Sequence, residues 1–382
     1  MTTGVLQEPG SSPAAHCAVV AAAHDLLGDK GFTQDPERVD PWLTDWRGRY
    51  TGRALGLASP ASTAQVSDLV KLCARHRIAI VPQGGNSGMA GGATPDDSGD
   101  GVILSLRRMD AIRSLDAGAG QVVSEAGVIL QTLHDAAEAE GRRFPLTLGG
   151  KGSATIGGLV STNAGGTQVL RYGTMRAQVL GLEAVLANGD VFDALTVLMK
   201  DNRGFDLKQM LIGSEGTLGI VTAATLRLLR APLSRATAWV GLGSVIDARS
   251  LLRSADRRLG DALEGIELVP AHCLESVLDH LPGARSPLEH RHEWNALIEC
   301  TSPSDDAAAL QERLEGVLAE ALESGLIADA AIAANETQAE QFWTLRDSIS
   351  AADRALGPAM QHDISVPVER MPEFILAAIP TM

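Results

Sequence analysis

Cysteine, aromatic residues and clusters of basic residues are all scarce in this sequence. Only four cysteines occur in 382 residues, and they stand far apart, without the spacing of a zinc site or a disulfide framework. Aromatic residues make up 3% of the chain, the net charge is -15, and no Lys/Arg cluster is interleaved with aromatic residues. Such a chain repels a phosphate backbone, so we expect no nucleic acid among its partners.

Long hydrophobic runs are missing as well. No run approaches the roughly 18 apolar residues that span a bilayer, and the N-terminus lacks a basic start followed by an apolar core. We therefore expect a cytoplasmic protein with reduced thiols and no transmembrane segment. Because 45% of the residues are hydrophobic and 21% are charged, the chain can form two packed domains and is not disordered.

Glycine, in contrast, is abundant: the chain has 40, and they are densest between residues 84 and 219. Three clusters rich in Gly, Ser, Thr and Asn occur at residues 84–92, 148–166 and 213–221. Loops without side chains let backbone N–H groups approach a dinucleotide pyrophosphate, and three such loops form one crevice if a sheet brings their ends together. Gly241-Leu-Gly243 does not complete a Rossmann fingerprint, and Lys151 lacks the upstream glycine and the following Ser or Thr of a P-loop. Neither nicotinamide nor ATP is therefore supported.

Hydrophobic periodicity predicts helices and strands in both halves of the chain, and hence an α+β fold. The predicted helices cover residues 14–27, 62–77, 128–140, 206–211, 245–259, 305–323 and 338–355. The predicted strands cover residues 78–81, 102–106, 121–126, 218–229, 236–242 and 294–299. Asn188-Gly189 predicts a hairpin between 180–187 and 190–194. Because Pro232 ends the last strand of the glycine-rich half, we predict an N-terminal helical segment (1–50), a glycine-rich domain (51–231) and a second domain (232–382).

Six strings carry a resemblance to a known family. They are Val81-Pro-Gln-Gly-Gly-Asn-Ser-Gly88, Phe144-Pro-Leu-Thr-Leu-Gly-Gly-Lys-Gly152, Ile156-Gly-Gly-Leu-Val-Ser-Thr-Asn-Ala-Gly-Gly166, Arg171-Tyr-Gly-Thr174, Asp206-Leu-Lys-Gln209 and Ile212-Gly-Ser-Glu-Gly-Thr-Leu-Gly-Ile-Val221. At these residues the sequence resembles the FAD-linked oxidoreductases with a vanillyl-alcohol-oxidase-type (PCMH-type) flavin domain, in the branch of the D-2-hydroxyglutarate and D-lactate dehydrogenases. The order and spacing of the strings match over roughly residues 40 to 380.

The resemblance implies a two-subdomain FAD-binding domain over residues 51–231, followed by an α+β substrate (cap) domain over residues 232–382. It also implies which positions hold FAD: Pro82, Gly84, Gly85, Asn86, Ser87, Gly88, Gly149, Ser153, Gly157, Gly158, Ser161, Thr162, Asn163, Gly165, Gly219, Ile220 and Val221. No His or Cys interrupts residues 82–92, where some relatives tether flavin through histidine. We therefore expect FAD to be bound non-covalently.

The resemblance also places substrate-binding residues in the second domain. Arg346 corresponds to the family's substrate-carboxylate arginine, and a guanidinium can grip a carboxylate through two parallel hydrogen bonds. Ser350 follows one helical turn later, on the same face, where D-2-hydroxyglutarate members have a substrate-binding Thr. Gln361 stands where those members place a Lys for the distal carboxylate, which favours a monocarboxylate substrate.

Family members continue for several dozen residues, with Gly-Asp-Gly-Asn-Leu-His and Glu-His-Gly strings that contribute a metal site and the histidine thought to take the hydroxyl proton. Neither string occurs here. We therefore expect the second domain to be C-terminally truncated and the family's metal site not to be completed, and we name no catalytic residue. His290-Arg-His292 is interpreted as a solvated loop, and His362 as a structural histidine.

Two hypotheses about function follow. The first is an FAD-dependent dehydrogenase that oxidises a small D-2-hydroxy acid by hydride transfer to flavin and passes electrons to an unidentified acceptor. The second is a truncated FAD-binding protein that is catalytically incomplete, or a subunit whose site is completed by a partner. A homodimer or a complex with a partner subunit is the assembly considered. In either case Trp42, Trp46 and Arg47 either cap the flavin crevice or pack in the core.

Overall fold

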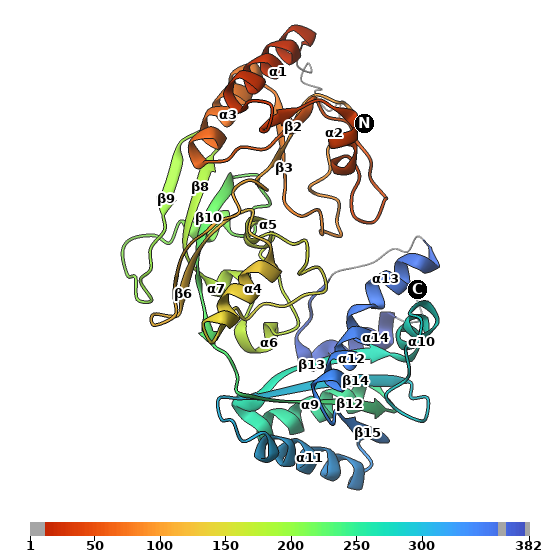
Figure 1. The fold of residues 1–382 in the computed structure, drawn as a ribbon. Helices are drawn as coiled ribbons and strands as arrows, with labels where there is room; N and C mark the ends of the chain where they lie inside the picture. Colours follow the sequence, from red (N-terminus) through yellow and green to blue (C-terminus); the bar gives the residue numbers. More distant parts are fainter. Residues whose placement is uncertain (1–11, 358–363, 379–382) are drawn as a thin grey trace, which may run out of the picture. The chain divides into compact units, whose positions relative to one another are not determined.

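The computed structural model describes residues 12–357 and 364–378. The chain divides into two compact units, coloured red to green and mainly cyan to blue in Figure 1. Within the described residues, the first unit comprises positions up to 146 together with Gly150–Gly166 and Tyr172–Arg230. The second comprises Thr147–Gly149, Thr167–Arg171 and the chain from position 231 onward. Two short segments of the glycine-rich half therefore belong to the second unit.

The first unit begins with a four-stranded sheet in the order β1-β2-β4-β3. Its elements are β1 (Phe32–Thr33), β2 (Gly56–Ala58), β4 (Gly101–Ser105) and β3 (Ala79–Gln83), with α1 (Pro13–Leu27), α2 (Pro36–Val39), η1 (Asp40–Trp42) and α3 (Thr63–His76). Helix α3 begins after Ser62, whose side chain accepts a hydrogen bond from the Gln65 N–H, and ends at Arg77 in the left-handed conformation. The apolar face of α3 packs with α1 and β4 in one core. Strand β3 then leads directly into the first glycine cluster.

A five-stranded antiparallel sheet, in the order β5-β6-β10-β8-β9, forms the rest of the first unit. Its strands are β5 (Ile112–Asp116), β6 (Gln121–Glu125), β10 (Gly219–Arg227), β8 (Val179–Leu186) and β9 (Val191–Ala194). The shorter elements are α4 (Leu130–Ala139), α5 (Ile156–Ser161), α6 (Val169–Tyr172), α7 (Met175–Gln178), α8 (Lys208–Leu211), β7 (Arg142–Arg143) and β11 (Leu229–Arg230). The hairpin predicted at Asn188-Gly189 is confirmed, because β8 and β9 pair around it and Gly189 has a φ of +83°.

The second unit is an antiparallel sheet, ordered β13-β14-β12-β15, with helices on both faces (Figure 1). The strands are β13 (Leu263–Pro270), β14 (Trp294–Ser302), β12 (Ser234–Leu242) and β15 (Asp329–Ile332). The helices are α9 (Val245–Leu259), α10 (Ala271–His280), α11 (Ala307–Glu323), α12 (Glu336–Asp347), α13 (Ile349–Leu356) and α14 (Met371–Ala378), with η2 (Gly260–Ala262) and η3 (Val368–Arg370). Both units together confirm the α+β class.

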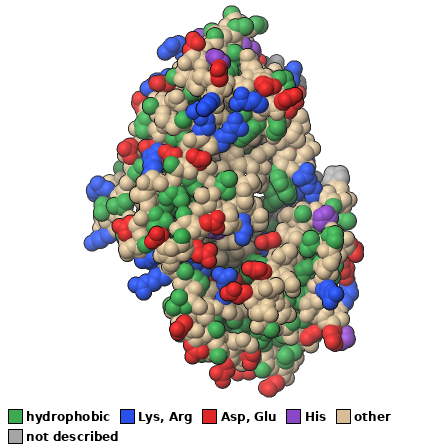
Figure 2. All heavy atoms as spheres, in the orientation of Figure 1, with side chains coloured by type: hydrophobic (Ala, Val, Ile, Leu, Met, Phe, Trp, Pro, Cys, Tyr) green, Lys and Arg blue, Asp and Glu red, His purple; other side chains and the backbone are tan. Residues whose placement is uncertain are grey.

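Alternation along β12 explains why both faces of this sheet are covered. Ala238 and Val240 lie in the core formed with α9 and α11, whereas Trp239 between them lies in the core formed with α10, α12 and α13. Trp239 is fully buried, its ring meets that of Phe342 edge-on, and its Nε1–H donates to Asn295 Oδ1 at 3.1 Å. Figure 2 shows acidic side chains on the surface of the second unit where α11 lies in Figure 1.

Two predicted elements differ from those observed. The helix predicted over residues 338–355 consists of α12 and α13, which meet at Ser348. The strand predicted over residues 218–229 ends as β10 at Arg227, and the next residues form β11, which pairs with β7. Among the described residues, no helix combines the length and the apolar character needed to cross a membrane.

Candidate functional site

Side-chain amides hold the first glycine loop, which follows β3. Gln83, at the end of β3, is buried, and its Nε2 donates to the carbonyl oxygens of Trp42 (3.0 Å) and Ala93 (2.7 Å). Asn86 adopts a φ of +50° and donates from Nδ2 to the carbonyl oxygen of Thr44 at 2.8 Å. The hydrogen bond between Gln83 and Ala93 connects the residues that precede and follow the loop. The other two hydrogen bonds attach the loop to residues 42–44.

Two glycines of this loop are required by close packing against the second loop. A Cβ on Gly84 would lie 2.5 Å from Thr155 Oγ1, and a Cβ on Gly85 would lie 1.6 Å from the carbonyl oxygen of Ser153. Gly88 is different, because it is exposed and a Cβ there would have no protein atom within 4 Å. The loop therefore contains glycines that serve packing and a glycine that leaves space open.

The same loop offers hydrogen-bond donors to a ligand. Among the residues that the structure describes, the backbone N–H groups of Asn86, Ser87 and Gly88 have no protein acceptor. Successive N–H groups of this kind, next to a glycine that leaves room, can donate to an anionic group such as a phosphate. We call residues 86–88 the cradle, and its donors suit the pyrophosphate of a dinucleotide.

The second loop leads into the short helix α5. Thr155 caps α5, since its Oγ1 accepts a hydrogen bond from the Gly158 N–H at 3.4 Å. A Cβ on Gly157 would lie 2.7 Å from Ala126 Cβ, so glycine lets α5 pack at the end of β6. Asn163, after α5, has a φ of +48°, and its Oδ1 accepts a hydrogen bond from the Arg176 N–H at 2.9 Å.

The third loop connects α8 with β10 and contacts both of the others. The N–H of Gly213 donates to the Val160 carbonyl at 3.1 Å, and the N–H of Glu215 donates to the Ser161 carbonyl at 2.8 Å. Gly216 has a φ of +80°, and a Cβ there would lie 2.8 Å from Pro82 Cγ. Apart from residues 148–149, the three glycine clusters therefore lie together within the first unit, as expected if a sheet brings their ends together.

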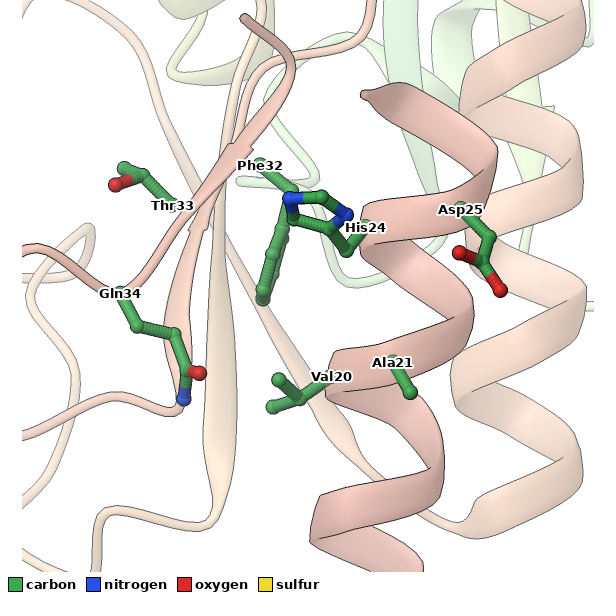
Figure 3. A pocket seen from close by; sticks show the side chains of 7 residues that line it. All are labelled: Val20, Ala21, His24, Asp25, Phe32, Thr33 and Gln34. Carbon is green, nitrogen blue, oxygen red and sulfur yellow. The ribbon is translucent and has the colours of Figure 1, made fainter. Parts of the chain in front are cut away.

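A cavity of about 370 Å³ lies beside these loops. It is lined by β3, the segment 92–101 and the third loop. Two carboxylate residues, Glu215 and Asp96, and the cation Arg53 are among its lining residues. A second hollow, of about 360 Å³, is formed by α1 and β1 and contains no residue of the three loops (Figure 3).

The other predicted cofactor positions differ in burial and in the unit to which they belong. Gly219, Ile220 and Val221 are buried in β10, and Ile220 belongs to the hydrophobic core, so their side chains do not line an open site. Thr162 and Gly165 are exposed. Gly149 belongs to the second unit, where a Cβ would lie 3.8 Å from the carbonyl oxygen of Asp347.

The segment 45–50, next to the first loop, folds around the carboxylate of Asp45. Its Oδ1 accepts hydrogen bonds from the N–H groups of Arg49 and Tyr50, at 2.6 and 2.7 Å. Its Oδ2 accepts one from the Arg47 N–H at 3.1 Å. Burial by itself raises the pKa of Asp45, but these three N–H groups and the charge of Arg49 outweigh it and lower the pKa below 3.8. The charged carboxylate therefore holds this segment.

Asp45→Asn is expected to lower the free energy of unfolding at neutral pH by about 1–3 kcal/mol, because an amide cannot accept all three hydrogen bonds. The pKa of Asp45 is lower in the folded state, so this stabilisation is present above the unfolded pKa and is lost as the pH falls through the folded value. Urea unfolding near pH 7.5 and near pH 3 should show the two proteins differing and then converging. Asp25→Asn, at an exposed position of α1, is the control. A difference that is the same at both pH values would contradict the role of the charge.

Trp42 packs in the core as well as bordering the loop. Its ring lies against the buried cluster of Val39, Leu57 and Ile103, with the Arg107 guanidinium 5.3 Å from the ring centroid. Of the two roles considered for Trp42, core packing is the one with contacts in the structure. Its carbonyl oxygen, and not its ring, is what reaches Gln83 of β3.

In the second unit, Arg346 lies near the end of α12 and faces β13. Its Nε and Nη2 both donate to Oε2 of Glu267, at 2.9 and 2.7 Å, and its Nη1 lies 3.4 Å from Asp347 Oδ1. The Arg346 side chain is 30% exposed. Ser350 is exposed and belongs to α13, so Arg346 and Ser350 do not lie on one uninterrupted helix as expected. The i, i+4 argument requires an uninterrupted helix, which ends here at Asp347.

Sequence reasoning missed two buried glutamates on the same sheet. Glu264 has no exposed side-chain surface, and its Oε2 accepts hydrogen bonds from Arg171 Nη1 (2.6 Å) and Thr301 Oγ1 (2.9 Å). Glu299, also buried, accepts a hydrogen bond from Trp343 Nε1 at 3.3 Å. The signal that could have found them is a carboxylate inside an apolar strand, as in Leu297-Ile-Glu-Cys300.

Of the two histidines in His290-Arg-His292, His292 is not solvated. His292 is only 11% exposed, its ring lies against Gly241, and its Nε2 is 3.7 Å from Asp329 Oδ2, so the solvated interpretation is wrong for this residue. Glycine at position 241 makes room for the ring.

Within residues 12–357 and 364–378, no group of three His, Cys, Asp or Glu side chains is arranged to hold a metal ion. Gln361 and His362 lie outside the described residues.

Comparison with known proteins agrees with this geometry. The family described as "FAD binding domain" matches residues 54–194, and "FAD linked oxidases, C-terminal domain" matches residues 231–379. A probable mitochondrial D-2-hydroxyglutarate dehydrogenase of Oryza sativa subsp. indica is 42% identical over 92% of this chain and 62% of its own length. A putative mitochondrial D-lactate dehydrogenase of Schizosaccharomyces pombe is 33% identical over 92% of this chain and 66% of its own.

A solved structure of an alkyldihydroxyacetonephosphate synthase has the same fold, with a TM-score of 0.72 at 17% identity over 98% of this chain and 76% of that one. An FAD-binding domain of PCMH type followed by an oxidase C-terminal domain defines a class of flavoprotein oxidoreductases. The chain belongs to the FAD-linked oxidases, and its relatives include proteins named D-2-hydroxyglutarate and D-lactate dehydrogenases. It spans less than two thirds of the length of those two relatives.

Proposed function

We propose that this chain oxidises a small D-2-hydroxy acid to the 2-oxo acid, with FAD as a non-covalent cofactor. The observations that carry the proposal are the contacts among the three glycine loops and the first-loop N–H groups with no protein acceptor among the described residues, in a chain that has both family domains. When bound, FAD supplies the hydride acceptor, and the protein supplies orientation and electrostatics. A separate acceptor then takes the electrons.

The proposed roles of the chain's own residues follow from their positions. The N–H groups at residues 86–88 bind the pyrophosphate, while the polar side chains of Ser161 and Asn163 extend the site along the second loop. Arg346 binds the substrate carboxylate, because its guanidinium is partly exposed and held by a packed helix. Ser350 is proposed to assist from α13. Orientation of the acid by such groups lowers the barrier by fixing the reacting carbon in place.

The substrate class that we propose is a monocarboxylate. The supporting observation is that Gln361, a neutral residue, stands where the D-2-hydroxyglutarate branch has a Lys for the second acid group. The names of the relatives include both a D-2-hydroxyglutarate and a D-lactate dehydrogenase, so both acids must be compared. We expect a higher kcat/KM for D-lactate than for D-2-hydroxyglutarate.

An anaerobic absorption spectrum of the purified protein tests the function. Oxidised flavin bands are expected to bleach after addition of D-lactate, less readily with D-2-hydroxyglutarate, and not with L-lactate, which serves as the stereochemical control. Bands that persist with both D-acids but bleach with dithionite would contradict the proposal and favour the alternative of an FAD-binding protein without its own turnover. Absence of flavin bands after reconstitution with FAD would contradict both.

A further inference from the structure

The contact between Arg346 and Glu267 uses one particular edge of the guanidinium. An arginine has five N–H donors and two edges that can each bind a carboxylate: the side edge, Nε with Nη2, and the end edge, Nη1 with Nη2. Glu267 Oε2 accepts from Nε at 2.9 Å and from Nη2 at 2.7 Å, so Glu267 occupies the side edge.

The end edge is only partly used. Nη2 keeps one N–H after the side edge is used, and Nη1 makes one hydrogen bond, to Asp347 Oδ1, at 3.4 Å, longer than the usual range of about 2.7–3.2 Å for an N–H···O bond. Each terminal nitrogen therefore keeps at least one N–H for a further carboxylate. Because Glu267 occupies the side edge, the donors that remain belong to the end edge.

Both partners are fixed on packed elements. Glu267 lies on β13 opposite Leu297 of β14, within the strand ladder, and its side chain is 22% exposed. Arg346 follows Phe342 and Leu345, which are buried and attach α12 to the sheet. Because both residues lie on packed elements, the two hydrogen bonds set the plane of the guanidinium.

We propose that Glu267 is a positioning residue that turns the end edge of the Arg346 guanidinium toward the substrate carboxylate. This inference rests on the proposed function, because it deepens the role of Arg346 in binding the acid. It also has an electrostatic consequence: Glu267 neutralises much of the charge of Arg346, so substrate binding depends on bidentate geometry more than on net attraction.

The substitution series Glu267→Gln and Glu267→Ala separates geometry from charge. A Gln can still accept hydrogen bonds from Nε and Nη2 through its Oε1, whereas Ala cannot. Positioning predicts that KM for the hydroxy acid rises about 10–100-fold in Glu267→Ala, with kcat also reduced, and that Glu267→Gln recovers most of the loss. Glu320→Ala, which removes a surface partner of Arg258 in the same unit, is the matched control and should leave both constants unchanged.

A simple competition between Glu267 and the substrate predicts the opposite result. Both variants would then bind the acid more tightly than the parent chain, because a competing anion is gone, and that result would overturn the proposal. Unchanged kinetics in Glu267→Ala would overturn it as well. If Glu267→Ala does not fold, the proposal is tested with Glu267→Gln and Glu267→Asp. KM for the hydroxy acid should rise in Glu267→Asp, whose side chain is shorter, and should rise much less in Glu267→Gln. Equal KM values in the two variants would overturn the proposal.

A double-substitution cycle separates this inference from the function itself. In an Arg346→Lys background, which has no planar fork, the added effect of Glu267→Ala is expected to shrink to less than about twofold. If Arg346→Lys alone leaves KM unchanged, the carboxylate role of Arg346 fails and the inference fails with it. If Arg346→Lys weakens binding but Glu267→Ala has the same effect in both backgrounds, only the positioning role fails.

Discussion

Gly85→Ala is expected to yield a protein that retains no FAD and unfolds about 1–3 kcal/mol more easily than the parent chain. A Cβ at this position would lie 1.6 Å from the carbonyl oxygen of Ser153 and 2.5 Å from its carbonyl carbon. These are backbone atoms, so no side chain can turn aside to make room. The first and second loops must separate, and the cradle for the pyrophosphate opens with them.

The matched control for this prediction is Gly88→Ala in the same loop. Gly88 has no protein atom within 4 Å of an added Cβ, so the free energy of unfolding without FAD should be unchanged. Its N–H is one of the groups proposed to bind phosphate, and a Cβ would occupy the open space beside it, so the affinity for FAD should still fall. Urea unfolding of the FAD-free proteins and titration with FAD measure the two effects separately. A Gly85→Ala protein as stable as the parent would show that the loops do not pack as described.

Glu264→Ala is expected to destabilise the second unit by about 3 kcal/mol, as breaking a buried ion pair usually costs about 3–5 kcal/mol and Arg171 is partly exposed to solvent. Glu264 Oε2 lies 2.6 Å from Arg171 Nη1 and 2.9 Å from Thr301 Oγ1. Its side chain is fully buried, while that of Arg171 is 26% exposed. Alanine therefore removes the acceptor shared by a buried hydroxyl and a half-buried guanidinium.

Thermal and urea unfolding, each followed by circular dichroism, measure this effect. The control is again Glu320→Ala, because the Arg258–Glu320 pair is about half exposed and should contribute less than about 1 kcal/mol. A second variant, Glu264→Leu combined with Arg171→Met, tests the mechanism: with both charges removed, much of the lost stability should return. Equal losses in Glu264→Ala and Glu320→Ala would contradict the importance of burial.

Local signals explain which parts of the fold were predictable. The hairpin at Asn188-Gly189 follows from residues that tolerate positive φ, and α3 follows from its cap at Ser62 and its apolar face. The break between α12 and α13 was not predicted, because no Pro or Gly interrupts residues 338–355 and Ser348 keeps helical backbone angles. Such a break depends on how the two helices pack on the sheet.

The candidate site also has features that the sequence predicted and features that it did not predict. The glycine clusters were recognisable because close backbone approach requires glycine wherever the loop finally lies, and Gly84 and Gly85 show that requirement as contacts below 3 Å. The environment of Arg346 was not recognisable, because Glu267 is far from it in sequence and becomes its partner only through the pairing of β13 with β14 and the packing of α12. His292 likewise packs its ring against Gly241, which is far from it in sequence.

By itself, the sequence determined the α+β class, the three glycine loops and the residues that match the family, because these depend on local backbone chemistry and on motif order. Only the tertiary structure decided which glycines serve packing and which leave space for a ligand, and which carboxylates pair with Arg171 and Arg346. The physical reason is that burial and ion pairing depend on strand register and helix packing between distant residues, which no local pattern records.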